Sequence, residues 1–326
     1  MEDEPIVSAK DRPVQQSGDP VPATLLSLAT AVPPFKVSQA GARKAVRTRF
    51  QRTSGLFDRL SGVFDNAGIR NRHTAAPADW YGSEHGLAER NRMYIATAKM
   101  LFSTVAATAI RKARLNPGEI DGIVTVSTTG IATPSIEARV FEQLQLRSDI
   151  RRVPVFGLGC AGGVSGLALA AQLARASPGT RWLMVAVEIC SASASLKADD
   201  AAAIVGSALF ADGAAAAVVE AGIEGPITLG PSAEVIWPDT HDIMGWRVED
   251  DGLQVVFDRA IPPFVEERFQ NAVAALSDRM GVPLESIRRL CCHPGGAKVV
   301  NAIEKAMALA HGSLDMERQL SRATAT

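Results

Sequence analysis

Short apolar runs alternate along this chain with longer segments in which apolar residues recur every three or four positions. The longest such segment, residues 87–113, predicts a helix with one apolar face. A second helix is predicted for residues 161–176, which are rich in Ala and Leu. Short apolar runs predict buried strands at residues 122–127, 152–158, 182–187 and 214–220. Strands that alternate with helices are typical of an α/β fold.

The alternation is interrupted once and then resumes. Residues 222–238 are rich in Gly and Pro and indicate a boundary. Beyond it, strands are predicted at 253–257 and 289–292, and helices at 263–280 and 298–310. We therefore expect two related α/β halves in one chain. The expected divisions are a disordered tail at 1–21, a first half at 22–222 and a second half at 223–326.

Composition narrows the function classes. The chain has 326 residues, of which 47% are hydrophobic and 21% charged, so a sizeable core is expected. Lys plus Arg (34) nearly equals Asp plus Glu (35), and this balance argues against nucleic acid or an anionic membrane as partner. The N-terminus is acidic and polar, unlike a signal peptide, and no uninterrupted apolar run reaches transmembrane length. Four cysteines are too few for a disulfide scaffold, so we expect a soluble cytoplasmic protein.

The strongest chemical signal is Cys160, within the stretch Val155–Gly163. A predicted strand ends there, glycines turn the chain, and a helix begins just after the cysteine. The end of a helix dipole and its unpaired amides favour a thiolate over a thiol. The flanking glycines would let a thioester approach and leave backbone donors for an oxyanion. Cys160 is therefore a candidate nucleophile.

Two other interpretations of this stretch remain open on spacing alone. Gly157, Gly159 and Gly162 also form a G-x-G-x-x-G pattern, and Glu188 ends the next predicted strand, where a ribose-binding acid would lie. The same glycines would equally allow a helix to pack closely on the sheet beside an inert, buried cysteine.

The second signal is His293, which follows the predicted strand at 289–292 and precedes Pro294. A histidine at the end of a strand can pair with Cys160, donate to a carbonyl oxygen or shuttle a proton. Such a histidine can also be structural. Cys291, Cys292 and His293 lack the spacing of metal ligands, so no metal site is expected.

Several motifs together resemble a known family. They occur in the family's order at Asn66–Ile69, Ser127–Pro134, Gly157–Gly163, Ala208–Gly213 and His293–Gly296. Over residues 22–318 the chain resembles a bacterial type III polyketide synthase of the chalcone and stilbene synthase superfamily. The resemblance implies a thiolase-like fold of two related α/β halves in layers, and a homodimer that uses coenzyme A thioesters without a further cofactor.

The resemblance also implies roles for individual residues. An acyl-CoA starter would be loaded on Cys160 and condensed with malonyl-CoA units, with His293 as ion-pair partner and oxyanion donor. Phe210 and Val255 would be gatekeepers between the CoA tunnel and the cavity. Other implied positions are the cavity residues Thr128, Cys190, Ser193 and Trp246, Thr133 in the partner subunit's cavity, and the CoA-phosphate residues Arg49 and Arg52. The charges around Arg49 and Arg52, taken alone, equally suit a solvated helix face.

The chain departs from the family pattern near its C-terminus. The third catalytic residue of the family, an asparagine in a Gly-Asn-Met-like motif after the histidine, has no counterpart, and residues 317–326 look like a foreign tail. The resemblance therefore implies a truncated chain whose second half is incomplete. Two alternatives follow: a catalytically impaired relative, or an enzyme like ketoacyl synthase III, which would prefer an acyl-carrier protein.

Overall fold

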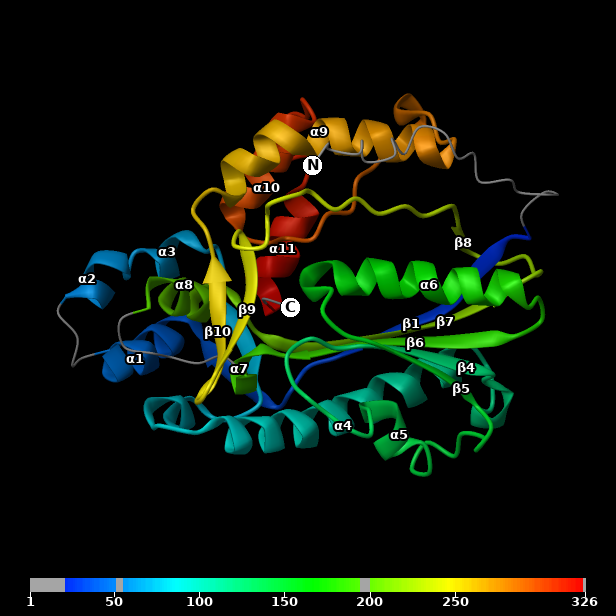
Figure 1. The fold of residues 1–326 in the computed structure, drawn as a ribbon, viewed down its shortest axis with the longest axis horizontal. Coiled ribbons are helices and arrows are strands. Elements are labelled where there is room, and N and C mark those ends of the chain that lie inside the picture. Colours follow the sequence, from blue (N-terminus) through cyan, green and yellow to red (C-terminus); the bar gives the residue numbers. More distant parts are fainter. Residues whose placement is uncertain (1–20, 51–54, 194–199, 325–326) are drawn as a thin grey trace, which may run out of the picture.

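A six-stranded mixed sheet forms the centre of the protein in a computed structural model, which describes residues 21–50, 55–193 and 200–324 (Figure 1). The strand order is β5-β4-β6-β7-β1-β8. β4 is parallel to β5 and β6, whereas β7 is antiparallel to β6 and β1. The strands are β1 (Ala23–Ala31), β4 (Gly122–Val126), β5 (Arg151–Val155), β6 (Arg181–Ile189), β7 (Asp212–Ala221) and β8 (Thr228–Leu229). The four strands predicted in the first half are confirmed; residues 1–20 of the predicted tail lie outside the described ranges.

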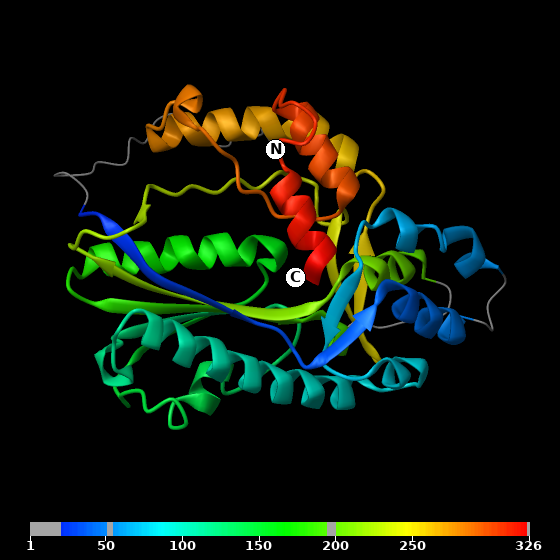
Figure 2. The ribbon, with the colours of Figure 1, turned by 180° about the vertical axis from the view of Figure 1, so that it is seen from behind.

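Helices cover both faces of this sheet. α4 (Leu87–Lys112) and α5 (Ile136–Val140) lie on one face and α6 (Gly162–Ala176) on the other (Figures 1 and 2). α6 lies unusually close to β4, because a Cβ at Gly162 or Gly166 would stand 2.5 or 2.6 Å from a methyl group of Val126. The glycines of this segment thus allow the close packing that was one of the sequence interpretations.

α4 is long and apolar enough to span a membrane by length and composition, which the sequence estimate did not anticipate. In the structure it is the central core helix. Leu101, Phe102 and Val105 are fully buried and pack in one cluster with Val185 and Val187 of β6. The apolar face of α4 is therefore covered by the sheet.

A smaller unit of helices and a hairpin lies at one end of the sheet (Figure 1). The buried Arg72 of β3 holds parts of this unit together, because its guanidinium donates to the carbonyl oxygens of Ala208 (2.9 Å) and Phe210 (3.0 Å) at the end of α8 (Ala201–Leu209). The unit consists of β2 (Phe35–Ser38), α1 (Gln39–Phe50), α2 (Leu56–Leu60), α3 (Val63–Asn66), β3 (Asn71–Thr74), η2 (Ala78–Gly82), α7 (Cys190–Ser193) and α8 (Ala201–Leu209). η3 (Pro117–Glu119) precedes β4.

The second half forms a layer of helices over α6, seen from both sides in Figures 1 and 2. Its elements are β9 (Met244–Glu249), β10 (Gly252–Phe257), α9 (Ile261–Met280), η5 (Leu284–Ser286), α10 (Ala297–Ala306) and α11 (Asp315–Thr324). β10, α9 and α10 confirm one predicted strand and both predicted helices. β9 and β10 pair with each other, and within the described ranges no second large sheet forms.

The strand predicted at residues 289–292 is wrong. These residues are not in a strand, and the described part of the chain gives no backbone hydrogen bond to residues 288–292. A strand requires a neighbour whose backbone pairs with it. The apolar pattern of this segment is therefore not sufficient to make it a strand.

α11 is joined to α10 by a buried ion pair. Glu304 accepts hydrogen bonds from Arg318 Nη2 (2.6 Å) and Nη1 (2.8 Å), and from the backbone N–H groups of Gly312 (3.1 Å) and Leu314 (2.9 Å). Hydrogen bonds from Arg318 are the main cause that lowers the pKa of Glu304 from 4.5 to about 2. The residues around 317 thus belong to a packed helix.

The close approach of α6 gives a stability prediction. Gly166→Ala places a methyl group 2.6 Å from Val126 and 2.9 Å from Met184, and should lower the free energy of unfolding by roughly 1–3 kcal/mol through overpacking. Gly163→Ala in the same helix meets nothing within 4 Å and should be neutral or stabilising by up to about 1 kcal/mol. Urea denaturation measures both; equal losses would contradict the close packing.

The Glu304 pair gives a pH-dependent prediction. Glu304→Gln should lower the free energy of unfolding at pH 7 by roughly 1–2 kcal/mol, because hydrogen bonds to a charged carboxylate are lost. A lowered pKa means that this contribution is present above the unfolded value of about 4.5 and is lost as the pH falls toward 2. The difference between wild type and variant in urea titrations should therefore shrink below pH 4.5. The exposed Glu285→Gln is the control, and a pH-independent difference would count against this origin.

Candidate active site

Cys160 lies in η4 (Gly159–Ala161), between the end of β5 and the start of α6. Gly157 (φ +91°) and Gly159 (φ +52°) take left-handed conformations that a glycine adopts readily. The predicted strand, glycine turn and helix are therefore confirmed. The Cys160 side chain is exposed to solvent, so a reactant can reach it.

The ionisation of Cys160 differs from the expectation. Neighbouring atoms desolvate the thiol, and this, together with the charge of Glu188, raises the pKa of Cys160 above its ordinary value of 9.0. The helix end was expected to lower that pKa. Partial desolvation outweighs the favourable backbone environment, so the resting group is a neutral thiol.

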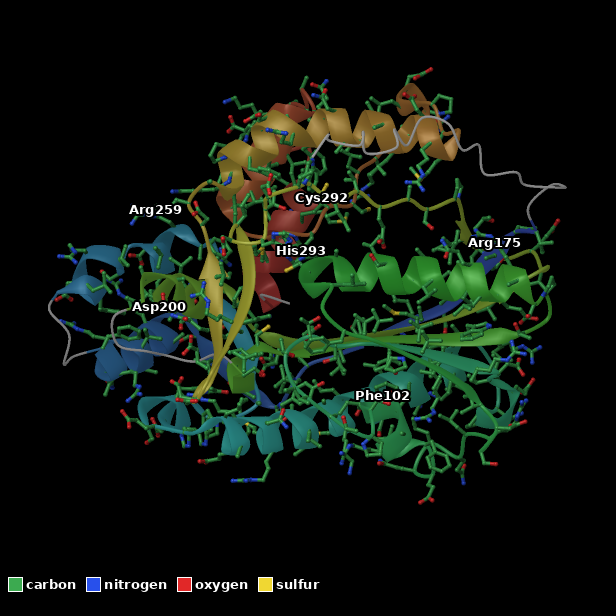
Figure 3. All side chains as sticks on the ribbon, in the orientation of Figure 1. Phe102, Arg175, Asp200, Arg259, Cys292 and His293 are labelled. Atoms are coloured by element: carbon green, nitrogen blue, oxygen red, sulfur yellow. The ribbon has the colours of Figure 1, made fainter. Side chains whose placement is uncertain are left out.

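His293 lies in the segment between η5 and α10. The N–H groups of Gly295 and Gly296 donate to the carbonyl oxygens of His293 (2.9 Å) and Pro294 (2.7 Å), and Gly296 takes a φ of +116°. A Cβ at Gly296 would lie 3.6 Å from Leu209, so this turn packs against the end of α8. Figure 3 shows His293 above the N-terminal end of α6, the end next to Cys160.

Both candidate catalytic groups favour their neutral forms. Desolvation lowers the pKa of His293 below its ordinary value of 6.5, so the imidazole is uncharged at neutral pH. Within the described ranges, no hydrogen bond joins the imidazole to Cys160. Desolvation therefore favours the neutral form of each of the two groups.

A buried hydrogen-bond network connects the neighbouring strand ends. The Glu188 carboxylate, at the end of β6, accepts from the backbone N–H groups of Thr128 and Thr129 and from Thr129 Oγ1 (2.6 Å). Thr128 Oγ1 in turn accepts from the N–H of Gly159 (3.2 Å), the residue before Cys160. From its sequence position, Glu188 was expected only as a candidate ribose-binding acid. Because Glu188 lies near the end of a predicted strand, its position in the sequence could have indicated that it lies close to Cys160.

The predicted cavity residues fall into two groups, one in the hydrogen-bond network of Glu188 and one around a pocket. Thr128 and the buried Ser193 belong to the network, since Ser193 donates to the carbonyl oxygen of Ile189 (3.2 Å). Cys190, Phe210 and Val255 instead line a partly open pocket with a cavity volume of about 80 Å³. Small residues of α1 and α8 form half of its remaining wall, polar side chains such as Arg72 and Tyr81 belong to the rest, and Cys160 is not in its lining. The Trp246 ring lies 5.8 Å from the ring of Phe210, at the border of this pocket.

The remaining predicted residues lie farther from the network. Thr133 is exposed, and its carbonyl oxygen accepts from Arg139 Nη2 (2.8 Å). Arg49 forms an ion pair with Glu84, at 2.7 Å between Nη1 and Oε1. Arg52 lies outside the described residues.

Neither a metal nor a dinucleotide gains support from the geometry. In the part of the chain that the structure describes, no group of three or more His, Cys, Asp or Glu side chains could hold a metal ion. The Glu188 carboxylate, which a dinucleotide site would need for a ribose, is occupied by the N–H and O–H donors of Thr128 and Thr129.

Comparison with known proteins places these features in a family. Residues 10–223 match the model for the N-terminal domain of chalcone and stilbene synthases. A 1,3,6,8-tetrahydroxynaphthalene synthase from Streptomyces peucetius is 32% identical over 293 residues, which cover 88% of this chain and 77% of that protein. Solved structures of related proteins have folds similar to that of this chain.

Two crystal structures illustrate the similarity of fold. The 1,3,6,8-tetrahydroxynaphthalene synthase of Streptomyces coelicolor, described as a bacterial type III polyketide synthase, superposes with a TM-score of 0.85 at 25% identity, covering 92% of this chain and 86% of that one. The C-terminal type III polyketide synthase domain of a Dictyostelium hybrid synthase gives 0.82 at 25% identity, with 93% and 87% covered. The fold is thus thiolase-like, and the chain belongs to the chalcone and stilbene synthase family of type III polyketide synthases.

Proposed function

We propose that this protein is an acyltransferase that loads an acyl starter from coenzyme A onto Cys160 and condenses it with malonyl-CoA units. The observation that carries the proposal is the exposed thiol of Cys160 at a glycine turn before α6, in a chain of this family. Coenzyme A thioesters are the only cosubstrates that it requires, and we place the reaction in the cytoplasm, where such thioesters are made.

Loading begins with attack of Cys160 Sγ on the thioester carbonyl. Because both groups are neutral at rest, His293 accepts the thiol proton as the sulfur–carbon bond forms, instead of holding a thiolate beforehand. The tetrahedral oxyanion takes hydrogen bonds from backbone N–H groups at the start of α6 or from His293. Collapse expels the coenzyme A thiolate, which recovers the proton from His293.

Condensation then forms a carbon–carbon bond. Malonyl-CoA loses carbon dioxide, and the electron pair left on its α-carbon attacks the acyl group on Cys160. The carbon–sulfur bond breaks, Cys160 leaves as a thiolate that regains a proton, and the product is a β-ketoacyl-CoA. His293 is the residue proposed to donate to the thioester oxygen while that carbanion exists.

The pocket beside Phe210 is proposed to hold the acyl group. Its mostly apolar wall suits a hydrocarbon chain, and the short side chain of Val255 narrows the gate less than an aromatic ring would. Trp246 would limit the opening from the other side of Phe210.

Arg49 would exchange its surface ion pair with Glu84 for a CoA phosphate, at a small cost because such pairs near the surface contribute about 0–1 kcal/mol. Arg52 is proposed to act with Arg49.

We propose that two copies associate along β5. This strand pairs with β4 on one side and is an edge of the sheet. Exposed apolar side chains follow β5 at Phe156 (67%), and others occur in α6 at Val164 (76%) and after β4 at Ile131 (55%). An unpaired edge beside exposed apolar side chains is a common site of association. Thr133 lies two residues from Ile131, on the surface where it could reach the partner's cavity.

The proposed activity can be tested by intact mass spectrometry. Incubation with a series of acyl-CoA starters should add one acyl group to the wild-type protein and none to Cys160→Ala. Because His293 is uncharged at neutral pH and accepts the thiol proton as the bond forms, the rate of loading should change little between pH 7 and 9. Cys291→Ala, which removes another exposed thiol, is the matched control and should load normally.

Labelled malonyl-CoA then separates the possible outcomes. Condensed product supports the synthase, whereas loading without condensation identifies a catalytically impaired relative. Product formed from malonyl-acyl-carrier protein but not from malonyl-CoA would indicate an enzyme like ketoacyl synthase III. A folded protein that forms no adduct on Cys160 would overturn the proposal.

The association surface gives a separate prediction. Val164→Glu places a charge among its exposed apolar side chains and should weaken the dimer at least tenfold, because the charge loses water when the surfaces meet. Light scattering after size-exclusion chromatography measures the mass. Val248→Glu, at a residue 65% exposed on β9, is the control and should leave the mass unchanged. A wild-type monomer, or a Val164→Glu dimer of wild-type affinity, would rule out this surface.

A further inference from the structure

We propose that Glu188 is the positioning residue of Cys160: it fixes the turn before the thiol through Thr128 and keeps a negative charge beside the sulfur. The proposal rests on the role of Cys160 given above, and it is tested by measurements that do not require turnover.

The side chain of Glu188 holds two neighbouring strand ends together through its hydrogen bonds. Its two carboxylate oxygens accept from the N–H of Thr128 at 2.9 and 3.0 Å, and Oε2 also accepts from the N–H of Thr129 at 3.0 Å. Thr129 Oγ1 donates to the same carboxylate at 2.6 Å and accepts from the N–H of Ile189 at 2.8 Å. The carboxylate therefore clamps the loop after β4 to the end of β6.

The clamp extends to the nucleophile through one hydroxyl group. Thr128 Oγ1 accepts from the N–H of Gly159 at 3.2 Å, and Gly159 takes the left-handed conformation that orients Cys160. The ends of β4 and β5 are also hydrogen-bonded to each other next to this point, because the N–H of Ser127 donates to the carbonyl oxygen of Val155 at 3.2 Å. Glu188, Thr128 and Gly159 thus form a short path between three adjacent strand ends.

Glu188 also acts on the site through its charge. Burial raises the pKa of the Glu188 carboxyl, and the hydrogen bonds from Thr129 and Thr128 oppose this shift because they favour the charged form. The charge of Glu188 acts on both Cys160 and Cys190, and Asp212 also acts on Cys190. From the other elements around the site, His293 is neutral at the relevant pH and Tyr94 is protonated. Desolvation is the larger cause that raises the pKa of the thiol, and the charge of Glu188 adds to it, because a negative charge disfavours a second one nearby. Removal of that charge should move the thiol pKa downward.

A purely structural role for Glu188 would not predict this shift. A buried carboxylate that only holds strands together affects stability and leaves the ionisation of Cys160 unchanged. Glu220 has that simpler role, because it pairs with Arg181 (2.9 Å) at the opposite end of the same sheet. Glu220 therefore provides a matched control for the loss of a carboxylate from this sheet.

The test of charge is the pH dependence of Cys160 alkylation by iodoacetamide, followed by peptide mass spectrometry. In Glu188→Gln, which removes the charge and keeps one acceptor oxygen, the midpoint of the profile should fall below that of wild type. Alkylation at pH 7 should rise several-fold. Glu220→Gln should keep the wild-type midpoint. An unchanged or higher midpoint in Glu188→Gln would overturn this part of the proposal.

The test of position is hydrogen exchange at the Gly159 amide, resolved by fragmentation. Thr128→Val keeps the shape of the side chain and removes the acceptor, so exchange at Gly159 should accelerate several-fold. Glu188→Ala should produce the same acceleration through the loss of the clamp, with Glu220→Gln unaffected. Wild-type exchange at Gly159 in a folded Thr128→Val protein would refute the path. Because neither measurement depends on catalysis, inactivity toward CoA thioesters would leave both results interpretable.

Discussion

The distance between α6 and β4 is the constraint on which the site depends. Two glycines on α6 face Val126, and at both positions the space admits a hydrogen atom and no methyl group. The first turns of α6 therefore lie with their backbone in direct contact with Val126 of β4. That contact fixes the turn that carries Cys160 at the ends of β4 and β6, where Glu188 and Thr128 meet it. Packing and chemistry are thus set by the same few residues.

Much of the first half could be predicted from local patterns. Apolar runs gave the strands β4, β5, β6 and β7, and periodicity gave α4 and α6, because each of these elements buries the face that its own sequence marks. The same local reasoning placed Cys160 at a strand–turn–helix junction. β1 was harder to find, since its pattern of Ala, Thr, Leu and Ser does not alternate cleanly, and its place between β7 and β8 is decided by partners far along the chain.

What could not be predicted depends on residues distant in sequence. Glu188 contacts Thr128 across 60 positions, and Arg49 finds Glu84 across 35. No local pattern reports such pairs. The segment at 289–292 shows the opposite error: its apolar residues predicted a strand, but a strand also requires a backbone partner. The direction of the pKa shift at Cys160 likewise follows from the atoms around the sulfur, whereas the sequence displayed only the helix end.

The neutrality of Cys160 and His293 also bears on chemical damage. Peroxides and alkylating agents attack thiolates much faster than thiols, so an exposed thiolate would be converted to sulfenic acid and further oxidised during the life of the protein. A thiol with a raised pKa and an uncharged imidazole nearby present little of that species at rest. The raised pKa therefore slows oxidation of a sulfur that is exposed to solvent.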